Sequence, residues 1–212
     1  MTTDATKAEA TSADADWHAY PDLDIPPILA AALEHFQQRG YHGTSVRSIA
    51  AGVGLTMPTL YYHYGNKEGI LHALLEIAMD DLQMHIDSSL QDAGDDTFKQ
   101  FVNLITSVGL HQTHRRDLAM LHDEFRFLGT DMRSRYVTRR TVVESTLEGV
   151  LTQGMKEGIF ADEDPHFTAR LLLGMVRSIL DWYHEGGPLS AAEIASRYAE
   201  RAVRIVTPAA LT

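Results

Sequence analysis

The sequence lacks cysteine, long apolar runs and an excess of basic residues. Without cysteine, the 212-residue chain can form neither a disulfide framework nor a thiolate zinc site, and it offers no cysteine nucleophile. No early segment joins a basic stretch to an apolar one, as a secretory signal does, and no stretch is long and apolar enough to span a bilayer. Hydrophobic residues make up 44% of the chain, enough for a substantial core. We therefore expect a cytoplasmic protein, outside the membrane, with one compact domain or a small domain joined to a larger one.

Basic residues are scarce and unevenly distributed. Eighteen Lys and Arg residues oppose 29 Asp and Glu residues, so the formal net charge is -11. Residues 1–24 carry -5 and residues 73–212 carry -7, whereas residues 25–72 carry +1 from three basic and two acidic side chains. Because Lys and Arg contacts to phosphates dominate DNA affinity, the overall charge argues against a nucleic-acid partner. The acidity lies outside residues 25–72, however, so that segment is still suited to bind DNA with modest affinity.

The apolar pattern predicts an all-α protein. Residues 1–24 are rich in Ala, Thr, Asp and Ser, which predicts a disordered leader in which Trp17 and Tyr20 could still dock. Apolar residues then recur at helical spacing, with no strand alternation and no hairpin signal. We expect a small domain at 25–72 and a larger helical domain at 73–212. The predicted helices, about nine, cover 26–40, 46–52, 57–64, 67–85, 97–113, 115–127, 131–156, 165–185 and 190–206.

Two short helices joined by a glycine turn are predicted between residues 44 and 64. Thr44 or Ser45 can cap the first helix, Thr56 can cap the second, and Gly54 permits the left-handed conformation of a tight turn. Such a pair forms a helix-turn-helix, whose second helix enters a major groove of DNA. The apolar residues expected to form the small core of this domain are Ile49, Ala50, Val53, Leu60 and Tyr64.

The other side of the second helix is left to face a DNA groove. Thr59 could offer its methyl group to a thymine, or its hydroxyl to a base edge or phosphate, while Tyr61 and His63 can donate to phosphate oxygens. Lys67 adds positive charge at a helix N-terminus, where an anion is favoured. An alternative interpretation makes the tyrosines core residues. The successive side chains at 62–64 cannot all point inward, however, because a helix has 3.6 residues per turn.

The segment TSVRSIAAGVGLTMPTLYYHYGNKE, residues 44–68, resembles the DNA-binding signature of the tetracycline-repressor (TetR) family. The resemblance covers roughly residues 28–75, about a quarter of the chain, and the remaining helices suit that family's ligand-binding and dimerisation domain. It implies a homodimer, joined through the last two helices, that represses from palindromic operator DNA and is released by a small-molecule effector. Met57 departs from the family pattern, where a polar or small residue is common, so we expect it to contact a thymine methyl group. The predicted DNA-binding residues are Thr44, Ser45, Arg47, Thr56, Met57, Pro58, Thr59, Tyr61, Tyr62, His63 and Lys67.

An effector site is expected among the middle helices, as an apolar pocket with few polar groups. The segment 177–190 resembles a C-terminal pattern of family members that respond to acyl-coenzyme A thioesters. Arg170 and Arg177 lie seven residues apart on one helical face, with Trp182 nearby, so they could hold a phosphate and stack an adenine. An ion pair of Arg177 with Asp181 is the alternative. The predicted ligand-binding residues are Phe101, Ile105, Phe125, Arg126, Val143, Leu147, Arg170, Arg177 and Trp182; further candidate polar members are Asn103, His111, His122 and Glu124.

Three alternatives stay open at this point. The apolar stripes of the last two helices could fill the core of one chain instead of a dimer interface. His111 and His114, with acidic residues close behind, permit a metal site, although eleven histidines make such spacings common and an ion-paired helix face is the other interpretation. A regulator that activates, or that has no effector, would keep the same DNA-binding domain. No nucleophile elbow, P-loop or dinucleotide fingerprint is present, so neither an enzyme nor a cofactor is predicted.

Overall fold

The computed structural model describes residues 16–208, which contain only helices and the loops that join them. This confirms the predicted all-α fold. Residues 1–15 of the predicted leader lie outside the described residues. Within the described part, no helix is long and apolar enough to cross a bilayer. The helices are α1 (Pro27–Gly43), α2 (Val46–Gly52), α3 (Met57–Tyr64), α4 (Lys67–Ala93), α5 (Thr97–His114), α6 (Arg116–Met120), the 3-10 helix η2 (Leu121–Phe127), α7 (Thr130–Lys156), α8 (Pro165–Arg177), α9 (Ile179–Trp182) and α10 (Ala191–Val206).

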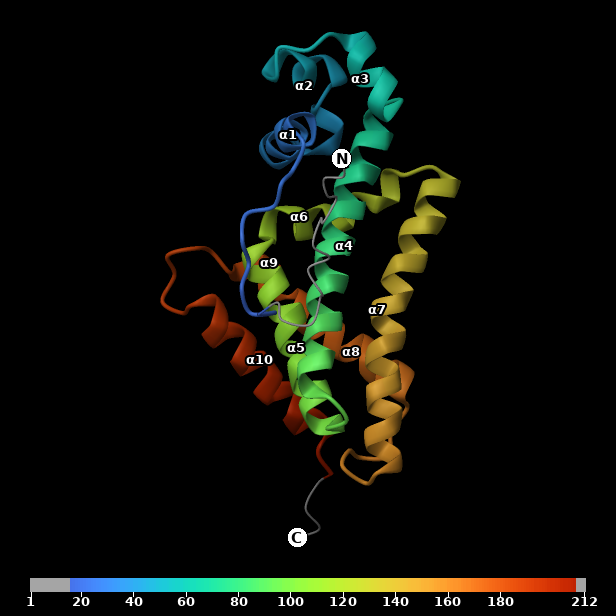
Figure 1. Cartoon of the computed structure of the whole chain (residues 1–212), viewed down its shortest axis with the longest axis vertical. Helices are drawn as coiled ribbons and strands as arrows, with labels where there is room; N and C mark the ends of the chain where they lie inside the picture. Colours follow the sequence, from blue (N-terminus) through green and yellow to red (C-terminus); the bar gives the residue numbers. More distant parts are fainter. Residues whose placement is uncertain (1–15, 209–212) are drawn as a thin grey trace, which may run out of the picture.

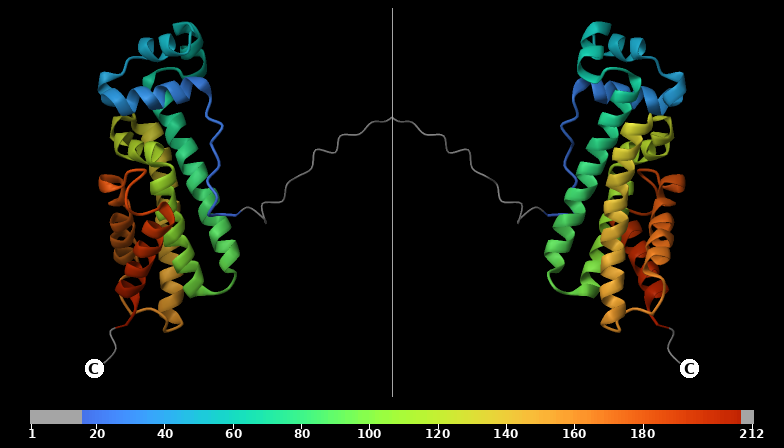
Figure 2. Two further views of the ribbon diagram at one scale, coloured as in Figure 1. Left: turned by 90° about the vertical axis from the view of Figure 1, so that its left-hand side faces the viewer. Right: turned by 90° about the vertical axis from the view of Figure 1, so that its right-hand side faces the viewer.

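The helices form a small head on an elongated body. Figure 1 shows α1, α2 and α3 gathered at one end, with α4 running from them into the body, where α5 and α7 pack against it and α8 and α10 complete the bundle. The two side views in Figure 2 show the same division, with the head at one end of the long axis. Because α4 belongs to both parts, any tilt of α4 within the body moves the head.

Local sequence signals place the helices of the head. Ser45 caps α2 by accepting from the backbone N–H of Ser48, whose hydroxyl in turn accepts from the N–H of Ser45. Gly54, in the turn between α2 and α3, has a φ of +66°, a region that favours glycine. Asn66 caps α4 by accepting from the N–H of Gly69 at 2.8 Å. The predicted miniature core is present: Ile49, Ala50 and Leu60 are buried, while Val53 and Tyr64 are half-buried against them.

Two predicted helices are divided in the structure, and one is longer than predicted. The predicted helix 115–127 consists of α6 followed by η2, and the predicted helix 165–185 consists of α8 and α9. The second division occurs at Ser178, whose hydroxyl donates to the backbone carbonyl of Met175 and contacts the Tyr198 hydroxyl of α10 at 2.9 Å. Such a side-chain hydrogen bond competes with the helical backbone pattern. Helix α4 continues to Ala93 instead of ending at residue 85, because buried side chains continue along it.

The segment 16–24 packs against the body, unlike the disordered leader predicted for it. Trp17 is buried beside Leu110 and Ala195, on α5 and α10. The Tyr20 ring stacks on His85 with ring centres 3.9 Å apart. The imidazole Nδ1–H of His85 donates to the Trp17 carbonyl at 3.0 Å. Two isolated aromatic residues thus hold a polar segment on the surface of the body.

A buried ion pair joins α4 to the end of α5. Asp81 on α4 has a side chain that is 3% exposed, and its Oδ2 accepts from Arg115 Nε at 3.1 Å. His111 Nδ1 lies 3.4 Å from the same carboxylate, and His85 Nε2 lies 3.8 Å from its other oxygen. Burial by itself raises the pKa of Asp81, but the contacts of His111 and Arg115 outweigh burial and hold that pKa below its ordinary value. Arg115 also donates to the carbonyl of Pro21, which ties the segment 16–24 to this pair.

Candidate DNA-binding surface and effector cavity

The outer face of α3 presents aromatic and imidazole side chains to solvent. Tyr62 is 86% exposed, and Tyr61 and His63 are also exposed. Arg47, on α2, is exposed as well. These side chains can donate hydrogen bonds to phosphates or base edges, and α3 is the second helix of the pair, which is the helix that enters a major groove. Of the predicted DNA-binding residues, Ser45, Arg47, Thr56, Pro58, Tyr61, Tyr62 and His63 are exposed, Met57, Thr59 and Lys67 are half-buried, and Thr44 is buried.

Several of the predicted contact residues serve the head itself. Thr44 is buried, and its Oγ1 lies 2.9 Å from the carbonyl oxygens of both His35 and Gly40, at the end of α1. Thr56 and Thr59 share a hydrogen bond of 2.9 Å between their hydroxyls. Met57 packs against the core of the head. The hydroxyl of Thr44 is therefore engaged, which differs from its predicted role in contacting DNA.

Lys67 holds the end of α1 against α4. Its ammonium donates to the backbone carbonyls of Tyr41 and Thr44, at 2.8 and 2.9 Å, and lies 4.3 Å from the centre of the Tyr41 ring. Burial lowers the pKa of Lys67. Two of its three N–H groups are used inside the head, so only one is left for a phosphate. A Lys67 substitution would alter the head as well as its DNA affinity.

The head contacts the body through aromatic stacking at η2. The ring of Tyr41, near the end of α1, stacks on Phe127 with ring centres 5.3 Å apart and planes nearly parallel. His42 meets the same ring edge-on at 4.2 Å. Close by, Glu68 Oε1 at the start of α4 accepts from the backbone N–H of Gly129 at 2.6 Å. Thus η2 and the start of α7 contact the head directly, in addition to the continuous helix α4.

A cavity of about 120 Å³ lies in the body beneath this junction. Its walls are mostly apolar, and a few polar side chains project from α5, η2, α7 and α8. Small-molecule sites in proteins have this character, with apolar walls and a few placed polar groups. The lining residues are Met79, Leu82, Val108, Gln112, His122, Arg140, Val143, Glu144, Leu173, Arg177 and Leu180.

The charged side chains of the cavity differ in how they are paired. Arg177 forms an ion pair with Asp123 of η2. Glu144 is engaged by Arg170 of α8, whose Nε lies 3.1 Å from its Oε1. Arg140 has no hydrogen-bond or ion-pair partner among residues 16–208, although its guanidinium lies over the ring of Phe125 at 5.6 Å. The cavity therefore has one guanidinium available to an anion.

Two of the nine predicted ligand-binding residues line this cavity, namely Val143 and Arg177. Phe101, Ile105 and Leu147 are fully buried elsewhere in the core, Phe125 packs on Tyr136, and Arg126 is exposed. His122, a further polar candidate from the sequence, does line the cavity, as does the apolar Val108 of α5, whereas Met79, Leu82, Arg140, Glu144, Leu173, Leu180 and Gln112 were missed.

The predicted phosphate and adenine site is not assembled. Arg170 pairs with Glu144, and Arg177 pairs with Asp123 instead of the predicted Asp181. The indole N–H of Trp182 donates to the Tyr198 hydroxyl on α10 at 3.2 Å. The division between α8 and α9 takes Trp182 off the helical face that the two arginines share, which explains the difference.

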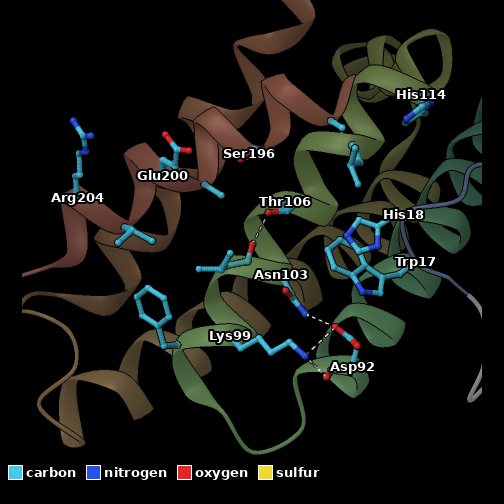
Figure 3. Close-up of a pocket in the computed structure, with 16 residues that line it drawn as sticks. Trp17, His18, Asp92, Lys99, Asn103, Thr106, His114, Ser196, Glu200 and Arg204 are labelled. Atoms are coloured by element: carbon cyan, nitrogen blue, oxygen red, sulfur yellow. Dashed lines mark hydrogen bonds and ion pairs between the residues drawn. The ribbon is translucent and has the colours of Figure 1, made fainter. Parts of the chain in front are cut away.

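A larger hollow of about 910 Å³ lies between α5 and α10, on another side of α5 (Figure 3). Trp17 and His18 stand at one end of it, and Lys99 and Asn103 both contact Asp92 on its floor. Three of its polar side chains, Asp92, Lys99 and Asn103, are thus paired with one another. Among residues 16–208, no group of three or more His, Asp or Glu side chains is placed to hold a metal ion; the metal-ligand candidate His111 contacts Asp81 instead.

Comparisons with known proteins agree with this architecture. Residues 28–74 match the sequence profile of the tetR family of bacterial regulatory proteins, and residues 93–206 match that of the tetracyclin repressor-like C-terminal domain. The HTH-type transcriptional repressor KstR2 of Mycobacterium tuberculosis is 30% identical over 176 residues, which cover 80% of this chain and 85% of that protein. The tetracycline repressor of class D from Escherichia coli is 31% identical over 154 residues, 71% of this chain and 66% of that protein.

Solved structures of transcriptional regulators also resemble this chain. The structure of KstR2 of Mycobacterium tuberculosis has a TM-score of 0.78 at 25% identity and covers 89% of this chain and 98% of that chain. A crystal structure of AibR in complex with isovaleryl coenzyme A and operator DNA has a TM-score of 0.74 at 27% identity, with coverage of 85% and 96%. The proteins matched are transcriptional regulators, a class that is not enzymatic. With more than half of its length in the matched C-terminal domain and a helix-turn-helix of the matched type before it, this chain belongs to the TetR family of DNA-binding transcriptional regulators.

Proposed function

We propose that this protein is a homodimeric repressor that leaves its operator when a small molecule enters the cavity between α4, α5, η2, α7 and α8. One observation carries the proposal: the short helix η2 places His122 in the cavity and Phe127, five residues later, against the head. A displacement of η2 at the cavity would therefore also move Phe127, which lies less than two helical turns away and contacts the head. The two α3 helices of a dimer would enter successive major grooves, roughly 34 to 36 Å apart, on a palindromic site.

The proposed effector is an acyl-coenzyme A thioester. The AibR structure is described as containing isovaleryl coenzyme A, a short branched acyl thioester, together with operator DNA. The cavity of about 120 Å³ can hold a short acyl group but not a whole coenzyme A. The unpaired guanidinium of Arg140 at its exposed side suits a phosphate.

Release requires that the effector bind one arrangement of the helices more tightly than the other. A ligand with equal affinity for both arrangements shifts nothing, whatever its affinity. In the proposed mechanism, an occupied cavity moves η2 away from α8 and tilts α4, which changes the separation of the two heads. The Arg177–Asp123 ion pair, which joins α8 to η2 at the cavity, is the contact that the effector would disturb first.

Operator binding provides the first test, with Tyr61→Phe as the variant. Loss of the phenol hydroxyl removes about 1.5 kcal/mol of hydrogen bonding to phosphate per head, and the dimer carries two heads. We expect affinity for an operator, selected by the wild-type protein from random DNA, to fall roughly 100-fold. Tyr64→Phe is the matched control, because Tyr64 faces the core of the head, and it should change affinity less than threefold. Equal operator affinities for both variants and the wild type would show that the Tyr61 hydroxyl does not contact DNA.

Coupling between cavity and head is tested by Phe127→Ala. We expect the variant to bind DNA and effector separately, within about threefold of wild type, yet to lose most of the effector-induced drop in operator affinity, because the Tyr41–Phe127 stack is gone. Couplings of this kind amount to about 5- to 150-fold in affinity. The measurement is operator affinity with and without saturating acyl-coenzyme A. Phe98→Ala, on the exposed side of α5, should keep the full response; a full response in Phe127→Ala as well would contradict the role of η2.

A further inference from the structure

The buried end of the effector cavity contains an amide that no protein group satisfies. Gln112 on α5 is 7% exposed, and its Oε1 has no hydrogen-bond partner among residues 16–208. Leaving a buried polar group unpaired costs about 1 to 3 kcal/mol, so native proteins rarely contain one without a purpose. Gln112 lines the cavity, and a molecule within the cavity is therefore the available partner.

His122 supplies a hydrogen-bond donor to the same cavity. Burial, reinforced by the charges of His111, Arg140 and Arg177, lowers the pKa of His122 to about 3, so the ring is neutral and carries one proton. Its Nδ1 is bonded to the hydroxyl of Tyr136, whose pKa is raised by burial. If the phenol donates this bond, the imidazole proton lies on Nε2; the opposite tautomer would leave the buried phenol hydrogen without an acceptor. Nε2–H is then the group that His122 offers to a ligand.

The charged side chains of the cavity are either exposed or already paired. Arg140 is exposed and unpaired within the described chain, whereas Arg177 and Glu144 are each engaged by other side chains. Gln112 and the neutral His122 carry no charge. Arg177 is already paired with Asp123, so a carboxylate beside Gln112 would have only the exposed Arg140 to offset the cost of its desolvation. The buried end therefore suits an uncharged polar group, and the exposed end suits an anion.

We propose that the effector carries a hydroxyl group that enters the buried end of the cavity, accepting a hydrogen bond from His122 Nε2–H and donating one to Gln112 Oε1. A hydroxyl is the smallest uncharged group that does both, and both side chains line the same cavity of about 120 Å³. The anionic portion of the molecule meets Arg140. This inference rests on the proposed function and makes it more specific: the effector is a short hydroxyacyl thioester of coenzyme A, not the unsubstituted acyl thioester.

The test compares two matched probes on the full-length protein by titration calorimetry, 3-hydroxyisovaleryl coenzyme A and isovaleryl coenzyme A. We expect the wild type to bind the hydroxylated probe at least tenfold more tightly. Gln112→Leu should reverse this preference, since its leucine no longer leaves a buried amide unpaired by the unsubstituted acyl chain. Arg140→Gln should weaken both probes alike. Gln91→Leu and Arg135→Gln, at exposed positions of α4 and α7, are the matched controls and should behave as the wild type.

The possible failures can be told apart. Equal affinity of the wild type for the two probes would overturn the hydroxyl inference and leave the acyl-coenzyme A effector standing, with ordered water in place of the hydroxyl. An unchanged preference in Gln112→Leu would likewise overturn the role of Gln112. If neither probe binds, or neither releases operator DNA, the proposed effector class fails and the hydroxyl inference falls with it.

Discussion

Replacing Asp81 with alanine is expected to lower the free energy of unfolding by about 3 to 5 kcal/mol, a large share of the stability of a small protein. The substitution leaves Arg115, whose side chain is only 10% exposed, without its carboxylate, and it removes the negative group between His85 and His111. Breaking a buried pair from one side has this cost because the remaining charge stays desolvated. Urea denaturation monitored by circular dichroism measures the change.

The neighbouring residue provides a control of matched chemistry. Asp80 also forms an ion pair between helices, with Arg139 of α7 at 2.7 Å, but its side chain is largely exposed. Exposed pairs contribute about 0 to 1 kcal/mol, so Asp80→Ala should be nearly neutral. A similar loss of unfolding free energy in both variants would contradict the large contribution that we assign to the buried position of Asp81.

The pH dependence of this contribution follows from the lowered pKa of Asp81. Burial opposes ionisation, but His111 and Arg115 more than offset it, so Asp81 binds a proton less readily in the folded state than in the unfolded state. Its stabilisation is therefore complete above the ordinary aspartate pKa, near pH 4, and is lost as the pH falls below that value. The difference between the wild type and Asp81→Ala should accordingly be constant near neutral pH and narrow in acid.

The pair of adjacent aspartates shows what helical periodicity can predict. Asp81 continues the buried positions 71, 74, 75 and 78 at helical spacing, so the pattern alone assigns it to the inner face of α4. What the pattern cannot supply is the partner. Arg115 follows Asp81 by 34 residues, across the turn between α4 and α5, and only the packing of those helices brings the two side chains together. The helix faces were predictable, whereas the ion pair was not.

The cavity was mispredicted for a related reason. Phe101, Ile105, Val108 and Gln112 follow one another at spacings of three and four residues, so all four lie on the inner face of α5. The sequence identifies that face but not where along it the neighbouring helices stop filling the space. Phe101 lies against Phe160 in a filled core, while Val108 and Gln112 line the cavity. Cavity position depends on the packing of α7 and α8, which no local pattern encodes.

The exposed face of α3 was predictable from the sequence, because the side chains that cannot fit in the core are also those expected to face DNA. Successive aromatic and imidazole side chains on an eight-residue helix must divide between core and solvent, and Tyr62 and His63 are exposed as that reasoning requires. Lys67 shows the limit of a motif, since it occupies the family position yet donates to the carbonyls of Tyr41 and Thr44. A motif identifies the position of a residue in the sequence and on its helix, but the hydrogen bonds that the residue makes depend on the groups that the fold brings next to it.

Leu171→Glu is expected to convert the proposed dimer to a monomer and to reduce operator affinity by at least a hundredfold. Leu171 on α8 is 48% exposed. Ser178, at the end of α8, contacts Tyr198 of α10, and Ile205 on α10 is also an exposed apolar side chain. Phe167 on α8 and Trp182 on α9 are exposed apolar side chains as well. Exposed large apolar side chains on neighbouring helices are typical of a dimer interface, and a twofold axis would place two glutamates in that interface, one from each protomer.

The size of the expected loss of operator affinity follows from the small net charge of the head. Residues 25–72 carry a net charge of only +1, so one head alone has little electrostatic affinity for phosphates. Specific binding, about 10⁻⁸ M or tighter, then requires two heads on two half-sites, whereas a monomer falls to the level of non-specific binding, about 10⁻⁴ to 10⁻⁶ M. Val142→Glu is the matched control, because Val142 on α7 is 46% exposed and lies outside α8 and α10. Sedimentation equilibrium and operator titration should separate the two variants; a dimeric Leu171→Glu protein with full operator affinity would place the dimer interface on another face.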